Sequence, residues 1–154
     1  MNERQATVHN AEEMVETEAR RRLPEAWQAG ERDLDLIGAE AIAFAGQEPG
    51  AVAAQLIDYA VSLPASDLFI DTDEEEVQIA LRFLGILRRV ARVDLDTGRR
   101  LLNYFKAIGG MDPGQRLRPE DGRWVYTRTD GHKTDLRINT TPALYGENMA
   151  IRLL

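Results

Sequence analysis

Two segments of the chain carry hydrophobic side chains at the spacing of an amphipathic helix. The first runs from residue 51 to 63 and stops before Pro64, because proline cannot continue a helix. The second has its apolar stripe at Leu101, Leu102, Phe105 and Ile108. We expect Asp94 or Asp96 to cap this second helix at its start. Gly109-Gly110 should end it, in the left-handed conformation that glycine adopts at little cost.

Strict alternation of apolar and polar positions, bounded by turn residues, predicts short strands around the second helix. The predicted strands cover residues 66–71, 77–83, 86–93, 123–127, 134–140 and 148–154. Gly85 and Asp130-Gly131 should form two of the hairpin turns. From residue 49 onward the order is helix, three strands, helix, three strands. This order predicts an α+β domain with an antiparallel-rich six-stranded sheet and the helices on one side.

Residues 1–48 differ in composition from residues 49–154, and we treat them as a separate region. They hold few large apolar side chains, so we expect a helical lead-in that is lightly packed or partly disordered. Residues 1–60 contain 5 Lys+Arg and 12 Asp+Glu, a net charge of −7, whereas residues 61–154 contain 14 of each. The lead-in is therefore the acidic part of the chain. A chain without a basic stripe is a poor candidate for binding nucleic acid.

Catalytic motifs are missing from the sequence. It contains neither a phosphate-binding G-x-x-x-x-G-K-S/T loop nor a G-x-G-x-x-G turn, and no cysteine. His9 and His132 are too far apart for a metal-ligand pair, so we expect no metal site. Neither a signal peptide nor a run of about 18 apolar residues occurs, which fits a cytoplasmic protein. We expect no enzymatic activity and no bound cofactor in this chain alone.

Arginines are frequent in the last 40 residues, and those in or beside the predicted loop and strands include Arg116, Arg118, Arg123, Arg137 and Arg152. Arg137 alternates with Leu136 and Ile138, so it should lie on the face of the sheet opposite to them. Adjacent antiparallel strands could bring Arg123 and Arg137 together. Paired guanidinium groups suit phosphate oxygens, and this favours a phosphate-facing site.

The alternative interpretation is that each arginine pairs with a local carboxylate on the surface. Arg123 would then pair with Glu120 or Asp121, and Arg137 with Asp135 or Glu147. The pattern of residues does not decide between these two interpretations.

Several stretches in order resemble one family, the type II secretion and type IV pilus assembly ATPases. Residues 65–71 (ASDLFID) resemble its A-S-D-I-H-I-E strand, and residues 82–88 (RFLGILR) resemble its R-x-D-G-x-L-R hairpin. Residues 119–123 (PEDGR) are similar to P-Q-D-G-R, and residues 135–142 (DLRINTTP) to D-x-R-V-S-T-x-P. Residues 145–154 resemble the H-G-E-x-x-V-x-R-L-L segment. The likeness covers about residues 50–154, two thirds of the chain.

This resemblance implies that residues 49–154 are the PAS-like domain preceding the motor domain of a hexameric ATPase. The motor domain of the same chain, expected after Leu154, would bind ATP and Mg²⁺. The resemblance places Arg123 and Arg137 toward the ATP phosphates, with Arg116 and Arg118 as secondary candidates. It also implies a cytoplasmic location peripheral to the inner membrane, where the domain would transmit motion to secretion or pilus platform proteins.

Two departures from the family pattern affect the hairpin. Phe69 replaces the histidine of the A-S-D-I-H-I-E strand, and Leu84 replaces the aspartate of R-x-D-G. Both make this part of the surface more apolar and put the usual role of the hairpin in doubt.

Two other functions remain open. A free-standing PAS-like module could bind a small ligand or a protein, with Phe83, Trp124 and Tyr126 lining an apolar cavity; ordinary packing on the sheet would explain the same aromatic side chains. An adaptor could instead dock a partner through its acidic lead-in.

Overall fold

The computed structural model describes residues 42, 44 and 46–154. The predicted lead-in, residues 1–48, lies almost entirely outside the described residues, so its helical character stays a prediction. Residues 49–154 form two helices and six strands in the predicted order. They are α3 (Pro49–Ser62), β1 (Asp67–Thr72), β2 (Glu76–Phe83), β3 (Ile86–Asp94), α4 (Leu95–Ile108), β4 (Glu120–Thr127), β5 (Lys133–Ala143) and β6 (Gly146–Leu153).

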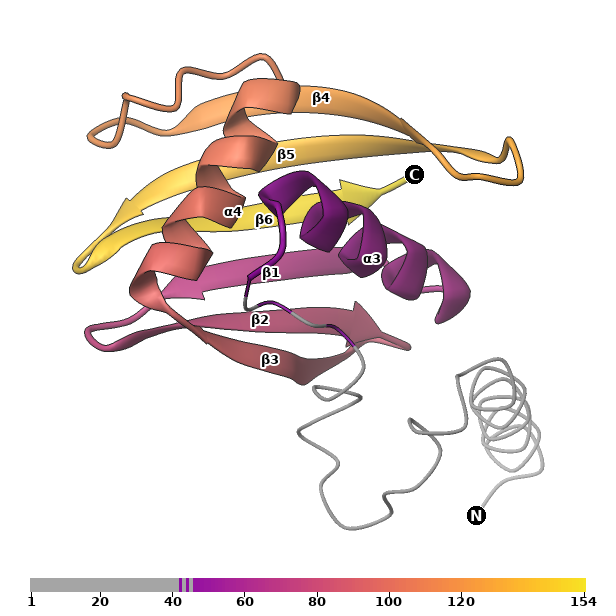
Figure 1. The fold of residues 1–154 in the computed structure, drawn as a ribbon, viewed down its shortest axis with the longest axis horizontal. Helices are drawn as coiled ribbons and strands as arrows, with labels where there is room; N and C mark the ends of the chain where they lie inside the picture. The colour runs from indigo at the N-terminus through magenta and orange to yellow at the C-terminus, as the bar shows by residue number, and fades with distance from the viewer. Residues whose placement is uncertain (1–41, 43, 45) are drawn as a thin grey trace, which may run out of the picture.

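The six strands form one sheet in the order β3-β2-β1-β6-β5-β4, and every neighbouring pair is antiparallel. Both helices lie on the same face of this sheet, and no described helix or strand covers the other face, which we call the open face (Figure 1). The predicted α+β class, with six strands and one-sided helices, is therefore confirmed. The central pair β1–β6 joins the two halves of the chain, and no hairpin pattern in the sequence pointed to it.

Helix α4 packs closely on the sheet through the predicted stripe, since Leu101, Leu102 and Phe105 are buried. Its approach to β2 is possible because residue 98 is glycine: a Cβ there would lie 2.3 Å from Cγ2 of Val77. Asp94 caps the helix, accepting a hydrogen bond from the backbone N–H of Thr97 at 2.9 Å. This decides between the two predicted caps.

Three local predictions need correction. Only Gly110 adopts the left-handed conformation, with φ of +77°, whereas Gly109 is right-handed with φ of −79°. Strand β4 begins at Glu120 rather than residue 123, and β5 continues to Ala143 rather than ending at residue 140. Strand β5 continues past Thr140 because residues 141–143 pair with residues 146–148 of β6, whereas its pairing with β4 ends at Thr140.

The aromatic side chains on β4 and α4 pack against one another. Trp124 makes edge-to-face contacts with Tyr104, Phe105 and Tyr126, at centroid distances of 6.5, 6.3 and 5.1 Å. These contacts fill the space between sheet and helix, which favours ordinary packing over a ligand cavity. A pocket between the two helices, lined in part by Val52 and Leu101, has about 10 Å³ of free space, room for one water molecule.

Candidate functional site

Three arginines lie side by side on the open face of the sheet. Arg123 of β4 stands directly opposite Arg137 of β5, and Arg137 stands directly opposite Arg152 of β6. Directly opposite residues project to the same face of a sheet. We call Arg123, Arg137 and Arg152 the arginine row. All three are exposed.

The strands place the row by simple alternation. The residues flanking Arg137, Leu136 and Ile138, are fully buried under the helices, as is Ile151 beside Arg152. Burial of these apolar neighbours therefore directs the arginines to the opposite, solvent-facing side. The predicted juxtaposition of Arg123 and Arg137 is found, and Arg152 extends it to a third strand.

One end of the row is held by a carboxylate. Arg123 forms a two-point pair with Asp135, in which its Nε donates to Oδ1 at 2.8 Å and its Nη2 donates to Oδ2. This hydrogen bond, together with the nearby charge of Arg137, lowers the pKa of Asp135 below its ordinary value. The predicted partners of Arg123, Glu120 and Asp121, were wrong because Asp135 sits two residues from Arg137 on the same face of β5.

The other end of the row is held by Asp67 of β1. Arg152 donates from Nε to Oδ1 of Asp67 at 3.2 Å, and the Nε of Arg82 on β2 lies 3.7 Å from the other carboxylate oxygen. Register extends the same line of side chains across both strands, since Asp67 faces Arg152 on one side and Arg82 on the other. The Arg82 guanidinium also lies over the ring of Phe69, 5.4 Å from its centroid. Phe69, a departure from the family pattern, thus supports a neighbouring cation.

Arg137 lies at the centre of the row, between two like charges. No carboxylate among the described residues forms a hydrogen bond or ion pair with it; the predicted pairings with Asp135 and Glu147 are absent because these two bind Arg123 and Lys106 instead. Directly opposed like charges destabilise a sheet unless something compensates for them. An anion placed over Arg137 would supply that compensation.

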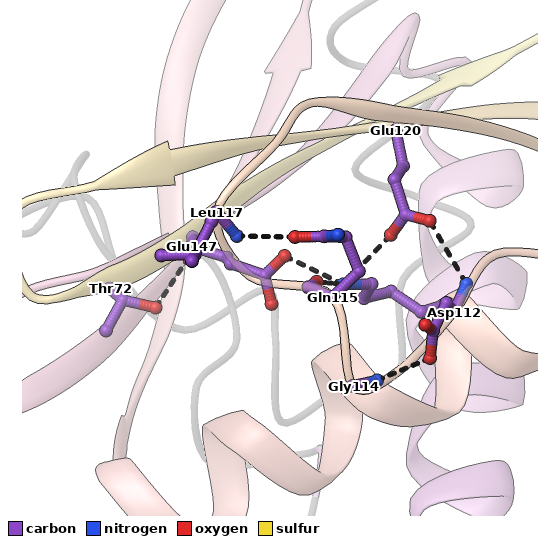
Figure 2. A network of polar contacts seen from close by, with 8 residues as sticks. Thr72, Asp112, Gly114, Gln115, Leu117, Glu120 and Glu147 are labelled. Atoms are coloured by element: carbon purple, nitrogen blue, oxygen red, sulfur yellow. Dashed lines mark hydrogen bonds and ion pairs between the residues drawn. The ribbon is translucent and has the colours of Figure 1, made fainter.

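Arg116 and Arg118 lie in the loop between α4 and β4 and are exposed. They are outside the arginine row. The loop is nonetheless held in a defined position, because Asp112 N–H donates to Glu120 Oε1 at 3.2 Å and Gly114 N–H donates to Asp112 Oδ1 at 2.8 Å. Figure 2 shows Asp112, Gly114, Gln115 and Leu117 of this loop gathered beside Glu120 and Glu147.

A buried lysine, Lys106 of α4, fastens this loop. Its ammonium group lies 2.8 Å from Glu147 Oε1 and 3.1 Å from Glu120 Oε2, and it also donates to the carbonyl oxygen of Gln115. Lys106 is fully buried and Glu147 is 5% exposed. Burial by itself would lower the pKa of Lys106, but hydrogen bonds and charge from Glu147 and Glu120 raise it above its ordinary value.

Sequence reasoning missed Lys106. It follows Phe105 directly, and the apolar stripe of α4 gave no reason to separate it from an ordinary surface lysine. The sequence held only a weak indication of this ion pair. Lys106 is a charged residue next to a buried position of an amphipathic helix, and two glutamates occur near the starts of later strands.

The exposed guanidinium groups of the arginine row are hydrogen-bond donors of the kind that suits an anion. Within residues 42, 44 and 46–154, no group of three or more His, Asp or Glu side chains could hold a metal ion. In the same part of the chain, no helix has both the length and the apolar character needed to cross a membrane. The open face carries three arginines: the two outer ones bind carboxylates, and the middle one, Arg137, forms no ion pair with a described carboxylate.

Comparison with known proteins shows which family this chain belongs to. A family model described as "Type II/IV secretion system protein" matches residues 49–154. The chain is 33% identical over 99 residues to type II secretion system protein E of Klebsiella pneumoniae, covering 64% of this chain and 20% of that protein. It is also 33% identical over 99 residues to the type IV pilus assembly ATPase PilB of Acinetobacter baylyi, covering 64% of this chain and 17% of that protein.

A solved structure shares the fold. The Legionella pneumophila ATPase DotB superimposes with a TM-score of 0.56 over 79% of this chain and 33% of that one, at 21% sequence identity. At this identity the likeness supports the fold alone. The chain spans about a fifth of the length of the curated relatives it matches.

Proposed function

The chain belongs to the type II/IV secretion system protein family, and from that premise we propose that residues 49–154 are the domain preceding the motor in a secretion or pilus assembly ATPase. The motor domain would lie in the remaining four fifths of the relatives' length. In the full-length hexamer this domain would contribute arginines to ATP bound by the motor domain. It would transmit motion to inner-membrane secretion or pilus platform proteins.

The observation that carries the proposal is that Arg137, at the centre of the arginine row, forms no ion pair with a described carboxylate. Arg137 is exposed, flanked by Arg123 and Arg152, and without a paired carboxylate in the described chain. Phosphate oxygens accept the parallel N–H groups of a guanidinium well, so a nucleotide triphosphate fits this position chemically. ATP would supply the phosphoanhydride that the motor domain cleaves with its Mg²⁺.

The roles of the two candidate arginines differ. Arg137 would bind phosphate directly. Arg123 is held by Asp135 through Nε and Nη2, which leaves its Nη1 group outside that pair. Asp135 would therefore orient Arg123 toward the same anion. Arg116 and Arg118, in the loop between α4 and β4, are secondary candidates for contacting the phosphates of ATP.

The test compares ATP turnover of this chain with that of the full-length protein and its variants. We expect this chain to be inactive, the full-length protein to hydrolyse ATP, and Arg137→Ala to lower turnover by about 10³-fold, as for other phosphate-clamping arginines. The matched control is Arg99→Ala, an exposed arginine of α4 on the helix side of the domain. Normal turnover in Arg137→Ala would refute the phosphate role. A full-length protein without ATPase activity would instead favour a free-standing binding module.

A further inference from the structure

The β2–β3 hairpin ends in an exposed apolar tip. Leu84, Ile86 and Leu87 are 42%, 55% and 57% exposed, although nearly all other large apolar side chains of β2 and β3 are buried. The hairpin lies at one edge of the sheet, with β3 as the outermost strand (Figure 1). Phe83, directly before the turn, is buried and anchors the tip to the core.

The turn keeps an apolar side chain at a cost to the backbone. Leu84 has φ of +50° and Gly85 has φ of +77°, the pattern of a turn in which both central residues are left-handed. Asparagine, aspartate and glycine adopt this conformation readily, whereas a leucine there is uncommon. A leucine at this position is easier to explain if its side chain gains an apolar environment.

Arginines lie close behind the tip. Residues 77–93 contain four arginines and no acidic residue, although Arg82 lies 3.7 Å from Asp67 and Arg92 lies 3.4 Å from Glu76. In the hairpin register Arg82 stands opposite Leu87, and Arg88 stands opposite Leu81. These arginines are thus set back from the turn by one or two pairs, about 3–7 Å along the strands.

An apolar tip with cations a few ångströms behind it matches the layering of an anionic bilayer surface. Apolar side chains enter the boundary between headgroups and acyl chains, while arginines remain among the anionic headgroups. A stable protein interface needs roughly 800 Å² from each partner, far more than three half-exposed side chains supply. We propose that the β2–β3 hairpin tip binds the surface of an anionic phospholipid bilayer. Arg82 behind the tip shares the carboxylate of Asp67 with Arg152, the last member of the arginine row, but the tip itself contains no residue of the row and the inference does not depend on the proposed ATPase role.

Vesicle sedimentation of the purified chain tests the proposal. We expect the chain to sediment with vesicles of equal parts phosphatidylglycerol and phosphatidylcholine and not with vesicles of phosphatidylcholine alone. Added salt should weaken the binding, because it screens the arginines. Absence of binding to the anionic vesicles would overturn the proposal.

Tip and control variants locate the contact. Leu84→Asn with Ile86→Thr and Leu87→Thr keeps residue types suited to the turn and strand, and should weaken vesicle binding at least about tenfold. The control is Leu117→Thr with Leu144→Thr, which removes two leucines that are 87% and 86% exposed elsewhere. Equal binding by the tip variant and the wild-type chain would refute the assignment, as would an equal loss in the control.

A labelling experiment does not depend on how the triple variant folds. The chain has no cysteine, so Leu84→Cys or Leu144→Cys introduces a single site for a polarity-sensitive fluorophore. The fluorophore at position 84 should shift to an apolar emission on anionic vesicles, and that at position 144 should not. An unchanged emission at position 84 would mean that the tip stays in water.

Discussion

Replacing Lys106 with methionine is the sharpest test of how this domain is held together. Methionine keeps the length and the apolar stem of the side chain but removes the ammonium group. That group lies 2.8 Å from Glu147 Oε1 and 3.1 Å from Glu120 Oε2 and donates to the Gln115 carbonyl. The variant would leave a carboxylate that is 5% exposed, and a second one nearby, without their counter-charge.

The expected loss is large because the whole cluster is buried. Removing one partner of a buried ion pair costs about 3–5 kcal/mol, since the remaining charge is left uncompensated. With a urea dependence of about 1–3 kcal/mol per molar, the unfolding midpoint should fall by roughly 2 M. The matched control is Lys133→Met at the start of β5, where the lysine is exposed and the change should be small.

Two further measurements separate charge from packing. Combining Lys106→Met with Glu120→Gln and Glu147→Gln should recover part of the loss, because neutral amides replace the unpaired carboxylates. The pKa of Lys106 is raised in the folded protein, so its stabilisation is complete below the unfolded pKa of about 10.4 and is lost as pH rises through the folded pKa. The stability difference between wild type and Lys106→Met should therefore shrink only at strongly alkaline pH. A loss below about 1 kcal/mol at neutral pH would refute the reasoning.

Three other predictions follow from the core and its edges. Phe105→Ala removes a fully buried ring and should lower the free energy of unfolding by about 3–5 kcal/mol in urea titrations; an unchanged midpoint would contradict the packing of α4. Gly98→Ala places a Cβ 2.3 Å from Val77 Cγ2, so it should cost about 1–3 kcal/mol, and adding Val77→Ala should restore part of it. The pKa of Tyr126 is raised to about 12 by burial and by its hydrogen bond to Asp58, so Asp58→Asn should move one tyrosine of the ultraviolet titration to lower pH; an identical titration curve would show that the bond is not formed in solution.

The strand and helix pattern of residues 49–154 was readable from the sequence because each element carries its own period and its own stop signals. A cap at Asp94 or Asp96, the turn at Gly85 and the burial of Leu101, Leu102 and Phe105 all follow from short-range chemistry, and the structure then chose Asp94 as the cap. Alternation alone also set Arg137 apart from Leu136 and Ile138. These features depend on residues within a few positions of one another, so the local sequence is enough to predict them.

The pairing of distant strands was decided by tertiary structure. The β1–β6 pair brings Asp67 opposite Arg152, 85 residues apart, and so gives the arginine row its second carboxylate. A strand's period says which side chains share a face but not which strand lies beside it. Arg152 therefore became part of the row only through the sheet order.

The burial of Lys106 shows the same limit. Its counter-charge on Glu147 lies 41 residues away, and the loop carbonyl of Gln115 completes the site. A charged side chain can be buried only where partners offset the loss of hydration, and those partners come from other elements. The sequence by itself thus determined the elements and the faces of this domain, while long-range packing decided which charges meet.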